Sequence, residues 1–212
     1  MKKAVIISSI IILISIFISL YIYPQMPEKV ASHWNSKGEV DGYMSKFWGI
    51  FLMPILSIVL LVLFVLFPKI DPLKKNITKF KKYYEWFIVL FILFLFYIYI
   101  ITLIWNLGYK FNMTAAIIPA FGILFFYIGI LTENAKRNWF IGIRTPWTLS
   151  NDEVWEKTHK LGGKLFKISG VIALLGILFQ KYAIYLFLIP VIFSALYSSI
   201  YSFFEYRKQK KK

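Results

Sequence analysis

Arg144 is the residue of this sequence whose surroundings most suggest a binding role. It follows a run of apolar residues and precedes Thr145-Pro146-Trp147, within the polar loop 133–164. A guanidinium in such a setting needs a carboxylate, backbone carbonyls or a phosphate as its partner. The simpler interpretation is a structural pin, in which Arg144 bonds a helix end, Asp152, Glu153 or a lipid phosphate. The other interpretation is a ligand site.

The second half of the same loop is predicted to form a helix. Ser150 and Glu153 have the spacing of a capping box, in which Ser150 caps the helix start and Glu153 reaches back. The helix is expected to end at Gly162-Gly163 and to lay one face on the membrane or on the floor of the bundle. That face carries Val154, Trp155, Thr158 and Leu161.

The loop 24–46 is the second segment that is more than a connector. Asn35-Ser36-Lys37-Gly38 is typical of a turn, and the flanking segments 29–34 and 39–44 alternate enough to form strands. The prediction is a small hairpin on the outer membrane surface. Its His33, Glu39 and Asp41 offer ligands for a divalent cation, and His33 alone offers a pH sensor. Ordinary polar pairing across the hairpin explains the same residues more simply, so no metal site is predicted.

Catalysis and cofactor binding find no support in the residue types. The chain has no cysteine, which excludes disulfides, thiolate metal sites and a cysteine nucleophile. Its two histidines, His33 and His159, fall on opposite sides of the membrane in the topology described below, so they cannot share a metal ion. No serine–histidine–aspartate set, glycine-rich phosphate loop or H-E-x-x-H pattern occurs. The chain is therefore predicted not to be an enzyme and to carry no cofactor.

Six apolar segments must position these loops. Five of them have about 20 residues without a charge, enough to cross a hydrocarbon core of ~30 Å. These five are Ala4–Tyr23, Phe47–Phe67, Trp86–Trp105, Asn112–Thr132 and Tyr182–Phe204. The segment Leu165–Gln180 is shorter and contains Lys167, so it spans only if its lysines reach the interfaces; a re-entrant segment is the alternative. The predicted fold class is an all-α integral membrane protein, a six-transmembrane helical bundle.

The placement of lysine and arginine predicts the orientation of this bundle. Most of the 25 Lys and Arg residues lie at the N-terminus, in the second and fourth gaps between spans and in the C-terminal tail. The positive-inside rule then places both termini in the cytoplasm and the hairpin loop outside the cell. The net charge of +15 follows from this topology, with anionic lipids as counter-ions and no direct contact with nucleic acid.

The chain divides into three parts along its length. Residues 1–68 hold the first two spans and the outer loop. Residues 69–132 hold a basic loop and spans three and four; the cluster Lys74–Lys82 in that loop is interpreted as a membrane-surface patch rather than a specific binding site. Residues 133–212 hold the inner loop 133–164, the last two spans and a basic tail.

Both loops resemble those of the SdpI family of bacterial and archaeal membrane proteins. The inner loop contains Arg137-Asn138, Gly142, Arg144-Thr145-Pro146-Trp147-Thr148-Leu149-Ser150, Asp152-Glu153, Trp155, His159 and Gly162-Gly163, which look like the signature of this family. The outer loop contains Met26-Pro27, His33-Trp34-Asn35, Gly38 and Asp41-Gly42, and is similar to the small domain that commonly precedes the signature. Together with the spans, the resemblance covers essentially the whole chain.

The resemblance implies a role in immunity. SdpI-type proteins lie in the cytoplasmic membrane of a prokaryote as multi-pass proteins and protect the producing cell from a secreted peptide toxin that attacks this membrane. Some are also implied to hold a transcriptional repressor at the membrane. The residues implied to contact a ligand or partner are Arg144, Asn138, Gly142, Thr145, Pro146, Trp147, Trp155 and His159 in the inner loop, and Pro27, His33, Trp34, Asn35, Gly38 and Asp41 in the outer loop.

A small solute transporter or exporter is the alternative function. It would need polar residues along a pathway through the spans. The candidates are serines of the first and last spans, together with Ser57, Thr102, Asn106 and Thr114. Small residues in spans usually mediate helix packing, and no carboxylate lies within a predicted span to carry a proton. A membrane enzyme ranks third, with Arg144, His159, Asp152 and Glu153 as its conceivable participants.

Overall fold

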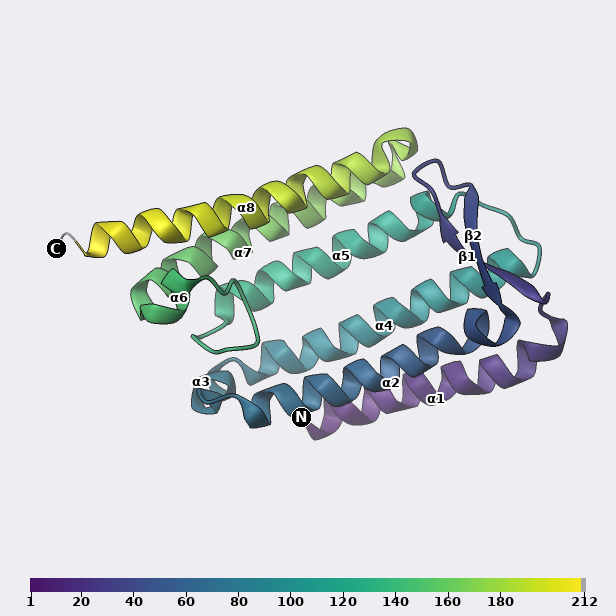
Figure 1. Ribbon diagram of the computed structural model, residues 1–212, viewed down its shortest axis with the longest axis horizontal. Helices are drawn as coiled ribbons and strands as arrows, with labels where there is room; N and C mark the ends of the chain where they lie inside the picture. The colour runs from purple at the N-terminus through teal and green to yellow at the C-terminus, as the bar shows by residue number, and fades with distance from the viewer. Residues whose placement is uncertain (211–212) are drawn as a thin grey trace.

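The protein is a bundle of six long helices with a two-stranded hairpin at one end (Figure 1). The computed structural model describes residues 1–210, so Lys211 and Lys212 of the basic tail lie outside the described residues. The long helices are α1 (Lys2–Ile22), α2 (Lys46–Ile70), α4 (Lys81–Asn106), α5 (Met113–Asn134), α7 (Asp152–Leu174) and α8 (Ala183–Gln209). The shorter elements are η1 (Tyr23–Gln25), β1 (Lys29–Trp34), β2 (Val40–Ser45), α3 (Lys74–Lys79), α6 (Pro146–Ser150), η2 (Leu175–Ile177) and η3 (Gln180–Tyr182).

Five helices of the described residues are long and apolar enough to cross a membrane, as a multi-pass membrane protein requires. They are α1 with η1, α2, α4, α5 and η3 with α8. α7 is not among them because its first half is rich in charged residues, yet it lies alongside α5 and α8 (Figure 1). The N-terminus and the last turn of α8 lie at the end of the bundle opposite the hairpin (Figure 1). The six spans and the cytoplasmic position of the termini stay predictions.

The predicted hairpin is confirmed. β1 and β2 pair antiparallel, β1 has the predicted bounds, and β2 begins one residue later than expected. Asn35 Oδ1 accepts hydrogen bonds from two backbone N–H groups of the turn, at 2.9 and 3.1 Å. Gly38 adopts the left-handed backbone conformation, with a φ of 81°, that closes this turn.

One side chain of α4 fastens the hairpin to the helices. Asn106 accepts a hydrogen bond from the N–H of Ala31 at 2.8 Å and donates one to the Ala31 carbonyl at 3.0 Å, as a neighbouring strand would. Beside it, Val30 is fully buried in a cluster with Ile50 of α2 and Leu103 of α4. The hairpin is therefore docked on α2 and α4 through one face of β1.

Glycines bring α5 and α7 into backbone contact. Gly122 and Gly129 of α5 face Gly170 and Gly163 of α7, and a Cβ atom on any of them would lie 2.5–2.8 Å from a backbone oxygen of the other helix. Close approach of this kind increases dispersion contact between helices. α7 therefore runs unbroken to Leu174, and the prediction that the helix ends at Gly162-Gly163 is wrong, because packing offsets the low helix propensity of these glycines.

The start of α7 also differs from the prediction. Asn151, and not Ser150, caps the helix: its Oδ1 accepts hydrogen bonds from the N–H groups of Glu153 and Val154 at 2.8 and 3.1 Å. Ser150 is instead the last residue of α6, and its hydroxyl donates to the carbonyl of Trp147. The short helix α6 occupies the preceding residues, so the cap falls one residue later than the capping-box spacing indicates.

Lys167, the charged residue of the predicted fifth span, has a partner on the neighbouring helix. Its Nζ lies 2.7 Å from Oε1 and 2.8 Å from Oε2 of Glu133, near the end of α5. A lone ammonium within a span is costly, and an opposite charge on the facing helix lowers that cost. Lys167 was expected to reach an interface between lipid and water, but its partner is this carboxylate.

Buried serines on α1 and α8 contribute to helix packing. The hydroxyl of Ser19 is hydrogen-bonded to that of Tyr99 on α4 at 2.6 Å, and Ser194 of α8 is bonded to Ser169 of α7 at 2.9 Å. Ser198 donates to a carbonyl of its own helix. These contacts favour the packing interpretation of the polar residues in the spans over a transport pathway.

Candidate functional site

The first part of the inner loop, residues 135–151, is folded around one buried asparagine. Asn138 is fully buried, and its Oδ1 accepts hydrogen bonds from the N–H groups of Phe140 and Ile141 at 2.9 and 2.6 Å. Its Nδ2 donates to the carbonyls of Lys136 and Ile141 at 2.8 and 2.9 Å. Two donors and two acceptor positions are the full capacity of an amide side chain. Asn138 therefore holds the shape of the loop and has no polar group left for a ligand.

Two side chains from the connection between α2 and α4 hold this loop against the bundle. Asp71 is buried and accepts hydrogen bonds from the N–H groups of Trp139 (2.8 Å) and Leu73 (2.6 Å). Asn76 of α3 donates to the carbonyl of Arg137 at 2.9 Å. The sequence reasoning did not assign Asp71 a role, although it is the single acidic residue in the basic stretch 69–82. That isolation is the signal that would have identified it.

Trp155 and His159 form the base on which the loop rests. Their rings are stacked with centroids 3.8 Å apart, and the indole N–H donates to the carbonyl of Ala135 at 2.8 Å. His159 Nδ1 donates to the carbonyl of Trp155 at 2.8 Å, and Nε2 accepts from the N–H of Ile143 at 2.9 Å. Burial in this part of α7, outside the predicted span, lowers the pKa of His159 from 6.5 to about 4. The imidazole is therefore neutral at neutral pH.

Gly142 occupies a position that only glycine fits. Its φ of 115° lies in the left-handed region, and an added Cβ atom would overlap His159 Nε2. The chain can therefore pass over the edge of the imidazole and bring the N–H of Ile143 within hydrogen-bonding distance.

Thr145-Pro146-Trp147 begins α6 and docks the loop on α8. Thr145 Oγ1 accepts a hydrogen bond from the N–H of Thr148 at 3.1 Å, and Thr148 Oγ1 accepts one from the N–H of Thr145 at 2.9 Å. This reciprocal pair is a capping box, and Pro146 takes the first helical position. The Thr145 hydroxyl is also bonded to Ser202 of α8 at 2.9 Å, and the Trp147 ring packs edge-on against Phe203.

Arg144 is exposed, and its guanidinium donates to the carbonyl of Trp139 at 2.6 Å. The partner is a backbone carbonyl of the loop and not one of those named for the structural pin, so both interpretations of Arg144 stay predictions. Arg137 is the arginine that forms an ion pair with Asp152, at 2.7 Å, and it also donates to the carbonyl of Leu149. Of the inner-loop candidates, Arg144 is the one that presents a charge at the surface; a ligand role for the others stays a prediction.

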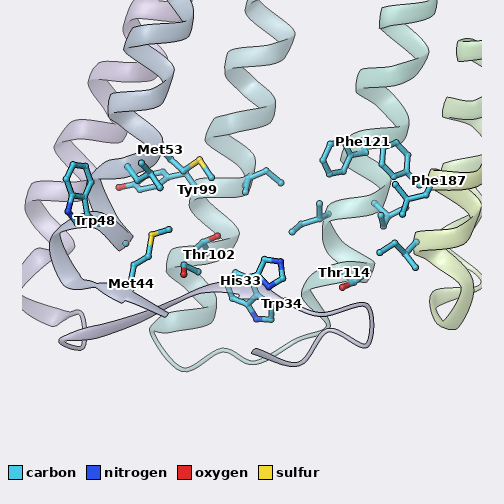
Figure 2. Close-up of a pocket in the computed structure, with 18 residues that line it drawn as sticks. His33, Trp34, Met44, Trp48, Met53, Tyr99, Thr102, Thr114, Phe121 and Phe187 are labelled. Atoms are coloured by element: carbon cyan, nitrogen blue, oxygen red, sulfur yellow. The ribbon is translucent and has the colours of Figure 1, made fainter. Parts of the chain in front are cut away.

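At the other end of the bundle, a cavity of about 410 Å³ lies beneath the hairpin. Its walls come from α2, α4, α5 and α8, and the strands β1 and β2 cover it (Figure 2). Figure 2 shows Trp48 and Met53 on the α2 side and Phe121 and Phe187 across from them. Its polar lining includes Thr102 and Thr114, so the cavity combines large apolar walls with a few polar groups, as ligand pockets do. We call it the outer cavity.

Two of the outer-loop candidates, His33 and Trp34, line the outer cavity. The Trp34 ring meets that of Trp105 edge-on with centroids 5.4 Å apart, and His33 pairs with Asp41 across the hairpin. The remaining candidates, Pro27, Asn35, Gly38 and Asp41, lie in or beside the hairpin and outside the lining.

The three hairpin residues that offered ligands for a divalent cation, His33, Glu39 and Asp41, do not meet at one point. Glu39 accepts a hydrogen bond from Asn35 at 3.0 Å, while His33 pairs with Asp41. Residues 1–210 contain no group of three or more His, Cys, Asp or Glu side chains that could hold a metal ion. The walls of the outer cavity were not predictable because apolar residues in spans look alike. Of the polar residues noted in the spans, Thr102 and Thr114 line the cavity, whereas Ser57 and Asn106 do not.

Comparison with known proteins matches both halves of the chain. The family model described as the SdpI/YfhL protein family matches residues 134–202, and a domain of unknown function, DUF1648, matches residues 10–58. The chain is 30% identical over 209 residues to "Immunity protein SdpI" of Bacillus subtilis (strain 168), which covers 98% of each chain. No solved structure matches. With this likeness over nearly its whole length, and with five helices fit to span a membrane, the chain belongs to the SdpI family of membrane proteins.

Proposed function

We propose that this protein protects the cell that makes it against a secreted, membrane-active peptide toxin. The observation that carries the proposal is the alignment with an immunity protein over 98% of both chains, because it includes both loops and every helix. The proposal places the protein in the cytoplasmic membrane of a prokaryote. Protection by binding needs no chemical reaction, which agrees with the prediction that the chain is not an enzyme.

The outer cavity is the proposed site of toxin binding. A peptide that attacks membranes carries an apolar face, and the cavity offers aromatic and aliphatic walls with a small number of hydrogen-bonding groups. Aromatic side chains such as Trp48, Phe121 and Phe187 provide a large contact area at a low cost in conformational entropy. In the predicted topology the cavity lies at the outer end of the bundle, the side from which a secreted peptide arrives.

The proposal is tested by survival of a sensitive host that expresses the chain and is exposed to a panel of secreted membrane-active peptides. For a peptide against which the chain protects, Leu52→Trp should abolish protection because Leu52 lines the outer cavity and a larger ring fills it. A loss of about 1.4 kcal/mol already weakens binding tenfold. The matched control is Ile55→Trp on the same helix, where Ile55 is exposed on the outside of the bundle.

Two results would contradict the proposed function or its site. Failure of the properly inserted chain to protect against any peptide would contradict immunity. Equal protection by Leu52→Trp and Ile55→Trp would remove the site from the outer cavity. Arg144→Ala completes the set, since loss of protection in that variant alone would move the site to the inner loop.

Repressor recruitment and solute transport remain predictions beside this proposal. The exposed guanidinium of Arg144 is the feature of the inner loop that a partner protein would meet first. For transport, the hydrogen bonds of Ser19, Ser194 and Ser169 within and between helices favour packing instead.

A further inference from the structure

A second cavity, of about 1020 Å³, lies at the end of the bundle opposite the hairpin. It is bounded by the first turns of α1, the last turn of α2, the short helix α3 and the start of α4. Its floor is apolar and is made by Val5, Ile6, Val65, Pro68 and Ile77, together with the ring of Tyr84. We call it the basal cavity, and none of the roles proposed above uses it.

Lysines surround the apolar floor of the basal cavity. The lining includes Lys2, Lys69, Lys74, Lys75 and Lys81, and no carboxylate. Within residues 1–210, the ion pairs of the structure include none made by the first four of these lysines. All five are exposed. The cavity therefore combines an apolar floor with a rim on which four lysines have no ion-pair partner among residues 1–210.

The carboxylates closest in sequence are already occupied. Asp71 is buried and accepts two backbone N–H groups, including that of Trp139 in the inner loop. Glu85 pairs with the terminal ammonium of Met1 and with Lys81. The charge on the rim must be balanced by an anion from outside the chain, because ammonium groups gathered around one hollow repel one another.

A ligand of the basal cavity has to balance the charge of the lysines and also cover the apolar floor. A polyanion such as nucleic acid or an inorganic phosphate ion would bind the lysines and leave the apolar floor in water. A zwitterionic lipid would cover the floor but bring no net charge. An anionic lipid does both, and basic pockets between spanning helices are known to hold anionic lipid head groups. α1, α2 and α4 are each able to span a membrane, so their ends lie where head groups meet acyl chains.

We propose that the basal cavity binds an anionic glycerophospholipid, with its phosphate among Lys69, Lys74 and Lys75 and an acyl chain on Val5, Ile6 and Val65. The site replaces the earlier interpretation of Lys74–Lys82 as a general surface patch. It is coupled to the inner loop, because α3 donates to the carbonyl of Arg137 through Asn76 and the α2–α3 connection accepts from Trp139 through Asp71. The proposal is independent of the toxin and of the outer cavity.

The test uses the full chain purified in a neutral detergent and stripped of lipid. Its melting temperature is measured with added phosphatidylglycerol, phosphatidylcholine or inorganic phosphate. Phosphatidylglycerol should raise the melting temperature by about 5 °C at saturation, as ligands that bind only the folded state do, and the other two should not. Equal effects of phosphatidylglycerol and phosphatidylcholine, or an equal effect of free phosphate, would overturn the proposal.

Paired variants locate the site. The triple variant Lys69→Gln, Lys74→Gln, Lys75→Gln should weaken the response to phosphatidylglycerol about tenfold or more in lipid concentration. Its control, Lys160→Gln, Lys164→Gln, Lys210→Gln, removes the same charge from exposed lysines that do not line the cavity, and should respond like the unmodified chain. Equal weakening in both triples would mean general attraction to a basic surface and would contradict a specific site.

A further pair of variants leaves every charge in place and tests whether an acyl chain occupies the apolar floor. Val65→Trp fills the apolar floor, whereas Val62→Trp places the same ring on an exposed face of α2. The response to phosphatidylglycerol should be lost in the first and kept in the second. A kept response in Val65→Trp, with an unchanged melting temperature in the lipid-free state, would show that no acyl chain occupies the cavity.

Discussion

Asn138 and Asn35 perform the same task at opposite ends of the molecule, but in different surroundings. Each Oδ1 accepts two backbone N–H groups and so shapes a turn. Asn138 is fully buried and donates to two carbonyls, whereas Asn35 is half-buried and donates to the exposed Glu39. The inner loop is therefore held by buried side-chain bonds, while the hairpin is held mainly by its strand pairing and covers a cavity.

This difference separates the residues that identify a family from those that are free to bind. Asn138, His159 and Thr148 belong to the motif-rich inner loop, and all three are buried and hydrogen-bonded within the chain. The outer cavity has few motif residues, yet it retains open space. A residue pattern can be specific because a loop needs it to fold, and such residues then have little capacity left for a ligand.

Two glycines with a left-handed backbone are expected to respond differently to substitution. Gly142→Ala should lower the free energy of unfolding by more than about 2 kcal/mol, because it adds overlap with His159 to the strain of a left-handed backbone. Gly108→Ala is the control: its φ is 109°, but nothing lies within 4 Å of an added Cβ. Thermal unfolding of the two detergent-purified variants, Gly142→Ala and Gly108→Ala, measures the loss of stability in each. Equal losses would mean that the contact with His159 contributes nothing.

The two asparagines provide the next test. Asn138→Ala should destabilise the protein by about 3 kcal/mol, because it leaves the N–H groups of Phe140 and Ile141 buried without partners. Asn35→Ala should cost only about 1 kcal/mol, since water can reach the turn it leaves. Chemical unfolding followed by circular dichroism compares the two variants. A larger loss of stability in Asn35→Ala than in Asn138→Ala would contradict the stronger role assigned to the buried asparagine.

The third comparison concerns the dependence of stability on pH. Burial lowers the pKa of His159 to about 4, whereas it is 6.5 in the unfolded chain, so between these values the unfolded chain binds more protons. The stabilisation by neutral His159 is fully present above pH 6.5 and is lost as the pH falls toward 4, by at most about 1.4 kcal/mol per pH unit. Melting temperatures measured from pH 7 to pH 4.5 should fall less steeply in His159→Gln than in the unmodified chain. An unchanged slope in His159→Gln would contradict the assignment of the pH dependence to the inner loop.

The helices and the hairpin were largely predictable because their signals are local. Apolar runs long enough to span a membrane, and the turn Asn35-Ser36-Lys37-Gly38, depend on neighbours in the chain. The errors occurred where distant residues decide the outcome. The end expected at Gly162-Gly163 is absent because α5 brings glycines to the same surface, and no local rule contains that contact.

For the candidate sites, too, local signals were predictable and contacts between distant residues were not. Residue types alone indicated which side chains carry hydrogen-bonding groups, and they singled out both loops. They did not show that Arg137, and not Arg144, pairs with Asp152, because that choice depends on how the inner loop folds back on α7.

A helical membrane protein with a hairpin and many basic residues follows from the order of residues alone, because length, hydropathy and turn chemistry are properties of contiguous residues. Which polar side chains are already bonded, and where space remains, depends on how the helices pack. The outer cavity takes its walls from four helices and the basal cavity takes its rim of lysines from four, so neither exists until the helices pack.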